Sequence, residues 1–285
     1  MKPSSFSYVA PHDLDEALAV LAGSHDAKVL AGGQSLVPAM NLRLAAPEAL
    51  VDINRIPGYD RVTVSGGVAT IGMLVRHADL SRPSFDDPLA DAFAAISRYV
   101  GHLPIRTRGT FVGSLVHADP AAEWCALALA TDATIVARSA DGTREIPCSG
   151  FFLGPFTTAL RPDELATEVR IPLLGGGGFG FAEIARTAGD FATVAAVATV
   201  SLDGDTIAEA RIGLAGVESK PTRGSAAEAS LVGRPATPDV IAEAAAAAAD
   251  SLHPIEDPNC SSAYRRQLAK VLVTRSLQQA VGGAS

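Results

Sequence analysis

The order of the predicted strands and helices constrains the fold of this chain more than any other sequence feature. Near the N-terminus, helical segments alternate with short apolar strands at 27–30 and 49–53, which predicts a small parallel sheet. From residue 62 onward the pattern changes to strand pairs that flank tight turns, which predicts antiparallel hairpins. These turns are Ser65-Gly66-Gly67, Asp141-Gly142 and Asp203-Gly204-Asp205.

The same pattern predicts an α+β chain of two domains. Residues 175–178 are rich in glycine and are the best candidate for a linker. We therefore predict an N-terminal domain at 1–174, with subdomains at about 1–55 and 56–174, and a C-terminal domain at 179–285. The C-terminal domain would contain the last hairpin and helical segments at about 222–232, 238–252 and 261–280.

Two polar segments predict helix starts. Asp13-Leu14-Asp15-Glu16 has the form of a capping box. Asp119-Pro120 precedes an Ala- and Leu-rich run, so we expect Asp119 as the N-cap and Pro120 as the first helical residue. The polar, glycine-containing stretch before it, 101–120, carries no helix prediction.

Composition excludes several classes of protein. A net charge of −8 argues against a general nucleic-acid binder, which needs a basic surface. No uninterrupted apolar run is long enough to span a membrane, and no signal peptide is visible, so the expected location is the cytoplasm. The three cysteines are widely spaced and form no Cys-x-x-Cys pair, so we expect no metal site and no iron–sulfur cluster held by this chain alone.

Gly175-x-Gly177-x-x-Gly180 matches the dinucleotide-binding fingerprint in form only. That motif requires a helix to open at its third glycine. Here Phe179, Phe181 and Ile184 alternate as in a strand. We therefore reject the fingerprint and interpret the segment as a linker followed by a strand.

Two Gly/Ser segments are better candidates for a phosphate site. The first is Ala31-Gly32-Gly33-Gln34-Ser35 and the second is Gly109–Ser114. Glycines allow a ligand to approach bare backbone, and successive amide groups can bind an anion. The two loops could bind the two phosphates of one pyrophosphate; the alternative is that both are ordinary turns.

Several ordered motifs resemble one family along nearly the whole chain. They begin with Ala31–Leu36, Asp52-Ile53, Ile71-Gly72, Arg76–Leu80, Ile105–Ser114 and Ala118–Glu123, and continue with Phe151–Gly154, Thr158–Leu160, Asp163–Leu165, Arg186, Gly189–Ala192 and Arg223 to Gly233. Together they resemble the FAD-binding medium subunit of molybdenum hydroxylases, the carbon monoxide dehydrogenase and xanthine dehydrogenase group.

The resemblance implies a fold and a set of FAD-binding residues. The fold is the p-cresol methylhydroxylase type, with a small parallel subdomain, a larger antiparallel one and FAD between them, followed by a domain of sheet and helices. The implied contacts are the first loop (Leu30, Ala31, Gly32, Gly33, Gln34, Ser35, Leu36), the second loop (Thr110, Gly113, Ser114), the polar group His117, Asp119 and Glu123, and Leu165 near the flavin. Phe191 is a further candidate to cover the flavin ring.

Three residues depart from the family pattern. One is Thr107, which replaces a common asparagine. Val112 stands where the family usually has the first glycine of a pair, which restricts the backbone of the second loop. Glu183 stands where related chains often have lysine, which would weaken an electrostatic contact to the flavin.

The resemblance implies an electron-transfer subunit that contains FAD. We expect the FAD to be bound non-covalently, because Gln34 stands inside the first loop and neither loop contains a cysteine. Electrons would pass from a large molybdenum subunit through the [2Fe–2S] clusters of a small subunit to FAD and then to an external acceptor. No side chain of this chain is expected to act as a catalytic acid, base or nucleophile. The alternatives are a stand-alone FAD-dependent oxidoreductase of the same fold, and a scaffold that has lost FAD.

Overall fold

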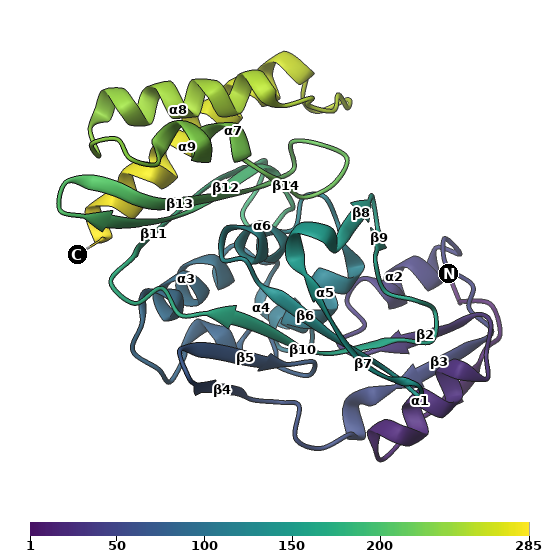
Figure 1. Cartoon of the computed structure of the whole chain (residues 1–285). Helices are drawn as coiled ribbons and strands as arrows, with labels where there is room; N and C mark the ends of the chain where they lie inside the picture. The colour runs from purple at the N-terminus through teal and green to yellow at the C-terminus, as the bar shows by residue number, and fades with distance from the viewer. Residues whose placement is uncertain (285) are drawn as a thin grey trace.

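The computed structural model describes residues 1–284, and its first sheet is parallel (Figure 1). The strands lie in the order β1-β3-β2, and both neighbouring pairs are parallel. Two helices accompany these strands, and the connection from β1 to β2 runs through α1. The bounds are β1 (Ser7–Val9), α1 (Leu14–Ala22), β2 (Ala27–Leu30), α2 (Leu36–Asn41) and β3 (Ala49–Asp52). This arrangement confirms the predicted parallel sheet, although the three-residue β1 was too short to predict.

The predicted capping box begins α1. The Asp13 side chain accepts a hydrogen bond from the Glu16 amide at 2.8 Å, and Glu16 Oε2 accepts one from the His12 amide at 3.0 Å. Carboxylates in this first turn also interact favourably with the helix dipole. The helix buries one face against the sheet through Leu14, Ala17, Leu18 and Leu21.

The second sheet is antiparallel and has the order β4-β5-β10-β6-β7. Its two hairpins are those predicted, and β10 joins them by pairing with β5 on one side and β6 on the other. A short two-stranded ribbon, β8 with β9, lies outside this sheet. The bounds are β4 (Val62–Ser65), β5 (Val68–Gly72), β6 (Thr134–Ser139), β7 (Gly142–Pro147), β8 (Phe152–Gly154), β9 (Thr157–Thr158) and β10 (Leu165–Pro172).

The stretch before residue 120 is more helical than predicted. It forms α4 (Leu103–Arg106) and α5 (Phe111–His117). Thr110 caps α5, because its hydroxyl oxygen accepts a hydrogen bond from the Gly113 amide at 3.1 Å. The sequence did not predict this helix, because Gly113 lies within it and glycine has a low helix propensity.

The predicted start of the next helix is wrong. α6 (Glu123–Ala130) begins after Ala122, so Asp119 is not its N-cap and Pro120 is not its first residue. The Asp119 carboxylate instead accepts a hydrogen bond from the Ala121 amide at 2.8 Å in a local turn. The Pro120 carbonyl oxygen accepts one from Gly216 at 2.7 Å, and this tertiary contact holds the segment outside the helix.

The third sheet has the order β11-β12-β13-β14 and is covered on both faces. Its outer face packs on the C-terminal helices, and its inner face packs on α6, all of whose residues are buried (Figure 1). A helix that is apolar on all sides belongs in such an interior. The bounds are β11 (Gly178–Ala185), β12 (Ala192–Asp203), β13 (Thr206–Ala215), β14 (Thr222–Arg223), α7 (Ser225–Leu231), α8 (Pro238–Ser251) and α9 (Ser262–Gly283).

Gly180 lies inside β11, which confirms that the apparent dinucleotide fingerprint is not one. The three sheets and their helices confirm the predicted α+β class. No helix within residues 1–284 has both the length and the apolar character needed to cross a membrane.

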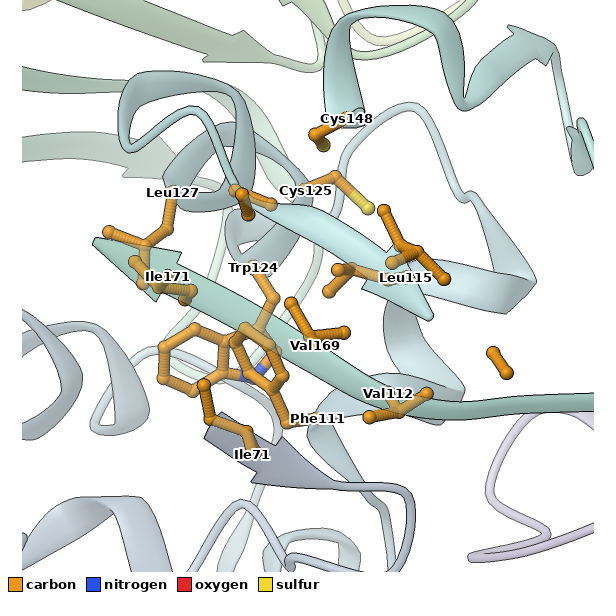
Figure 2. Close-up of a cluster of buried hydrophobic side chains, with 14 of the residues drawn as sticks. Ile71, Phe111, Val112, Leu115, Trp124, Cys125, Leu127, Cys148, Val169 and Ile171 are labelled. Atoms are coloured by element: carbon orange, nitrogen blue, oxygen red, sulfur yellow. The ribbon is translucent and has the colours of Figure 1, made fainter. Parts of the chain in front are cut away.

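The main core lies between α6, α3 (Pro88–Ser97) and the second sheet. Figure 2 shows Trp124 at its centre, with Phe111 and Ile71 beside it. Trp124 is fully buried, and its ring packs edge-on against Phe93 and Phe111 at centroid distances of 6.1 and 5.3 Å. The three cysteine thiols are buried and free, as expected for core residues.

Candidate functional site

The first candidate loop turns the chain between β2 and α2 and leaves its amide groups open. Gly33 has a φ of +71°, a conformation that favours glycine. Within residues 1–284 no group accepts a hydrogen bond from the backbone amides of Gly33, Gln34 or Ser35, and the Ser35 side chain does not cap α2. A turn of unpartnered amides with a positive φ is a typical anion-binding turn.

The second candidate loop leads into α5. Thr110 is 2% exposed and is held by its capping bond. A Cβ on Gly113 would lie 2.6 Å from Thr110 Oγ1, so a larger residue there would displace the cap. Ser114 follows in the first turn and is partly exposed.

The structure brings the two loops into direct contact. A Cβ on Gly32 would lie 2.4 Å from the Arg108 carbonyl oxygen and 2.5 Å from Gly109 Cα, so the two backbones touch where Gly32 has no side chain. The second loop is also tied to the segment 75–78, because the His77 amide donates to the Gly109 carbonyl oxygen at 3.0 Å. Two ordinary, unrelated turns would not need this close approach.

Val112 does not obstruct the second loop. It lies in the first turn of α5, and its side chain is 3% exposed within the main core (Figure 2). Val112, which replaces the first glycine of a Gly-Gly pair, therefore has its side chain in the core and not at the open edge of the loop.

His117, Asp119 and Glu123 follow the second loop closely. His117 ends α5, and its ring lies 5.1 Å from that of Phe156 between centroids; burial lowers its pKa. Glu123 is the first residue of α6 and is 4% exposed. Burial raises the pKa of its carboxyl to about 7, and the charge of Asp119 acts in the same direction.

Glu183 lies on the face of β11 that packs toward α6. It is paired in register with Ala195, whose side chain belongs to the main core. Its Oε2 atom is buried and has no hydrogen-bond partner within residues 1–284. Burial raises the pKa of Glu183 to about 8, and the nearby Glu123 adds to this shift.

Leu165 and Phe191 lie on other elements. Leu165 is the first residue of β10 and is 4% exposed, with its side chain in the main core. Phe191 precedes β12 and is 56% exposed. Within residues 1–284 no three histidine, cysteine or carboxylate side chains are grouped in a way that could hold a metal ion.

Comparison with known proteins agrees with this geometry. Residues 4–174 match the model of the FAD binding domain in molybdopterin dehydrogenase, and residues 179–280 match that of the CO dehydrogenase flavoprotein C-terminal domain. The chain belongs to this family. It is an oxidoreductase subunit whose N-terminal part is an FAD-binding domain.

Several relatives align with this FAD subunit over its whole length. It is 39% identical to 6-hydroxypseudooxynicotine dehydrogenase complex subunit alpha of Paenarthrobacter nicotinovorans, an alignment that covers 99% of this chain and 96% of the relative. It is 34% identical to the carbon monoxide dehydrogenase medium chain of Hydrogenophaga pseudoflava, with 98% of each chain covered. In a solved structure of carbon monoxide dehydrogenase from that organism, lacking the Mo-pyranopterin moiety, a chain 35% identical matches with a TM-score of 0.95 over 100% of both.

The residues of this FAD subunit fit the pyrophosphate of its cofactor. The open amides of Gly33, Gln34 and Ser35 provide hydrogen-bond donors for an anionic group, beside the contact between the two loops at Gly32. From the sequence, no site role is predicted for Asn54, Arg76 or His77. Asn54 donates a hydrogen bond to the Ala31 carbonyl oxygen in the first loop, and Arg76 and His77 donate to the carbonyl oxygens of Arg108 and Gly109 at the second. Asn54 carried no motif signal, whereas Arg76 and His77 stood within a motif of the resemblance.

Proposed function

We propose that this chain binds FAD non-covalently between its two loops and passes electrons through it. FAD, when bound, supplies the redox chemistry, and the chain binds, orients and shields it. Electrons would come from the iron–sulfur clusters of a small partner subunit, which receives them from a large molybdenum subunit, and would leave to an external acceptor. The observation that carries the proposal is the contact between the two loops at Gly32, beside the open amides of Gly33 to Ser35.

The proposed contacts divide by position. We assign the pyrophosphate to the two loops, the remaining polar groups of FAD to the residues that follow the second loop, and the flavin to the surroundings of Leu165. The set is Leu30, Ala31, Gly32, Gly33, Gln34, Ser35 and Leu36, then Thr110, Gly113 and Ser114, then His117, Asp119 and Glu123, and Leu165.

We also propose a domain boundary at 175–178, between the FAD-binding domain at 1–174 and the C-terminal domain at 179–285. In support, the glycines at 175–177 lie between β10 and β11, and the outer face of the third sheet has its own core with α7, α8 and α9. The need for partner subunits is supported by relatives that are named as medium chains or subunits.

Gly33→Asp tests the loop assignment. It places a carboxylate among the amides proposed to bind phosphate, so we expect FAD affinity to fall by about 100-fold or more. Gly66→Asp is the matched control, because Gly66 is an exposed turn glycine with a φ of +58° and open space around its Cβ. Flavin fluorescence quenching on titration of the chain gives the affinities. Equal FAD affinity for Gly33→Asp and wild type would show that the first loop is misassigned.

Two further measurements separate the proposal from its alternatives. Acid precipitation should release all the flavin, and flavin retained in the pellet would contradict non-covalent binding. Size-exclusion chromatography with the small iron–sulfur subunit should give a co-eluting complex. A chain that bound no FAD would support the scaffold, and one that oxidised an organic substrate unaided would support a stand-alone oxidoreductase.

A further inference from the structure

Arg76 reaches the second loop with both its side chain and its backbone. The guanidinium Nη1 donates to the Arg108 carbonyl oxygen at 2.5 Å, beside Gly109, and the Arg76 backbone forms an isolated bridge with Thr110. The other guanidinium nitrogen, Nη2, donates to Asn54 Oδ1 at 2.6 Å. One planar group therefore connects the second loop to Asn54 through two bonds in fixed directions.

Asn54 carries this connection to the first loop. Its Nδ2 donates to the Ala31 carbonyl oxygen at 2.8 Å and to Asp52 Oδ1 at 2.6 Å. Asp52 Oδ1 also accepts a hydrogen bond from the Asn54 backbone amide at 3.0 Å, and the Tyr8 hydroxyl donates to Asp52 Oδ2 at 2.5 Å. These partners orient the amide, with its oxygen toward Arg76 and its nitrogen toward Ala31.

Arg76 also brings a positive charge to the place where the loops meet, and this charge has no direct ion pair within residues 1–284. It is half-buried, and no carboxylate oxygen in residues 1–284 lies within 4.0 Å of its guanidinium nitrogens. Burial and the neighbouring Arg108 lower its pKa, while the carboxylates of Asp79 and Asp52 act in the opposite direction. A guanidinium group keeps its proton at neutral pH. A partly desolvated cation without an ion-pair partner is favourable where an anion binds.

We propose that Arg76 and Asn54 form a clamp that holds the two loops at the spacing of one pyrophosphate and adds a positive charge beside it. Both are positioning residues, and the inference rests on the proposed binding of FAD by these loops. A pyrophosphate needs both loops at a fixed separation, whereas a single phosphate can bind to one of them. The clamp therefore selects FAD over FMN.

The test measures the Kd of FAD and of FMN for the full chain by fluorescence quenching. We expect Arg76→Ala and Asn54→Ala each to weaken FAD binding by about 10- to 100-fold, the loss typical of a charged hydrogen bond. FMN binding should weaken by less than about threefold in Asn54→Ala, because one loop is enough for it. In Arg76→Ala it should weaken less than FAD binding, because FMN loses the charge of Arg76 but does not need the connection between the loops. The double variant should bind FAD no more weakly than the weaker single variant, since either change breaks the same connection.

Chemical rescue distinguishes a clamp from general loss of structure. A low, non-denaturing concentration of guanidinium ion should restore FAD binding to Arg76→Ala but not to Asn54→Ala. Arg61→Ala is the matched control, because Arg61 has a side chain that is 67% exposed and lies outside the clamp. If Arg76→Ala does not fold, Arg76→Lys replaces it. Lysine keeps the charge but cannot donate two hydrogen bonds in fixed directions, so it should still weaken FAD binding by about 10-fold, and more than FMN binding.

Each contrary result has one meaning. Wild-type FAD affinity in Arg76→Ala, additive losses in the double variant, or equal weakening of FAD and FMN would overturn the clamp while leaving FAD binding in place. Failure of the wild-type chain to bind FAD would overturn the proposed function, and the clamp with it.

Discussion

Glu123 is a buried residue at the start of α6, and Glu183, on β11, is half-buried with a buried Oε2 atom. Their pKa values are raised to about 7 and about 8, chiefly by burial, and each has a neighbouring acid that adds to the shift. The neighbouring acid is Asp119 for Glu123, and Glu123 for Glu183. The unpartnered Oε2 of Glu183 makes this residue the more costly of the two to ionise.

The contribution of Glu183 to the stability of the chain should therefore fall as the pH rises. Between about pH 4.5 and 8, the folded state keeps a proton on Glu183 that the unfolded state has lost, so the free energy of unfolding decreases through this range. Glu183→Gln removes the ionisation and keeps the shape. We expect it to be more stable than the wild type at pH 8 by about 1–2 kcal/mol, with a smaller difference at pH 5.

Thermal unfolding at the two pH values measures this difference. Glu256→Gln, at an exposed position, is the control and should follow the wild type at both. A stability difference between Glu183→Gln and the wild type that does not change with pH would contradict the assignment of a raised pKa to Glu183.

At the scale of elements, β11 and α9 approach each other so closely that only glycine fits between them. A Cβ on Gly178 would lie 1.7 Å from the Ala280 carbonyl oxygen, and one on Gly180 would lie 1.9 Å from that of Ser276. Gln279 adds a specific contact, because its side-chain oxygen accepts a hydrogen bond from the Phe181 amide at 2.9 Å. The long C-terminal helix is thus held by backbone contact as well as by apolar packing.

Gly180→Ala should force this helix away from the strand. Because the obstacle is backbone rather than a movable side chain, we expect a loss of about 2–3 kcal/mol in the free energy of unfolding, measured by urea denaturation. Gly282→Ala makes the same chemical change near the end of α9, where no atom lies within 4 Å of the new Cβ. That control should be neutral or stabilising by a few tenths of a kcal/mol, about what helix propensity predicts near a frayed end. Equal effects of the two changes would disprove the close contact.

At the scale of the whole molecule, Asp132 links the N-terminal part to the third sheet. It follows α6, and its carboxylate forms ion pairs with Arg211 of β13 and Arg223 of β14. Arg223 is also paired with Glu228 at 2.8 Å, so the charges form a network rather than an isolated pair. The Thr199 hydroxyl adds a buried hydrogen bond to the Ala130 carbonyl oxygen at 2.8 Å.

Asp132→Asn should weaken this link without changing the shape of the residue, and asparagine tolerates the φ of +49° found there. We expect a loss of about 1–2 kcal/mol in the free energy of unfolding, larger than for an exposed pair because the network is partly buried. Glu243→Gln is the comparison, since it breaks the exposed pair between Arg234 and Glu243 and should cost less than about 0.5 kcal/mol. Urea denaturation in low and high salt measures both; equal losses would argue against a special role for Asp132.

Local patterns predicted the elements that depend on neighbouring residues. The capping box at Asp13 and the strand at 27–30 were predicted with their observed bounds, because a helix cap and a short apolar run act over a few residues. The hairpins followed from their turn residues in the same way. The Asp119 cap failed because Gly216, far along the chain, donates to the Pro120 carbonyl oxygen and competes with the helix.

The sequence by itself determined that the chain has two Gly/Ser loops, an order of elements typical of one FAD-binding family, and too few cysteines for its own iron–sulfur cluster. Only the tertiary structure decided that the loops touch at Gly32, that Val112 lies in the core, and that Arg76 and Asn54 join the loops. The physical reason is range. Turn and helix preferences are set by adjacent residues. A contact between Gly32 and Arg108 instead depends on how the first sheet packs against the helices that follow β5.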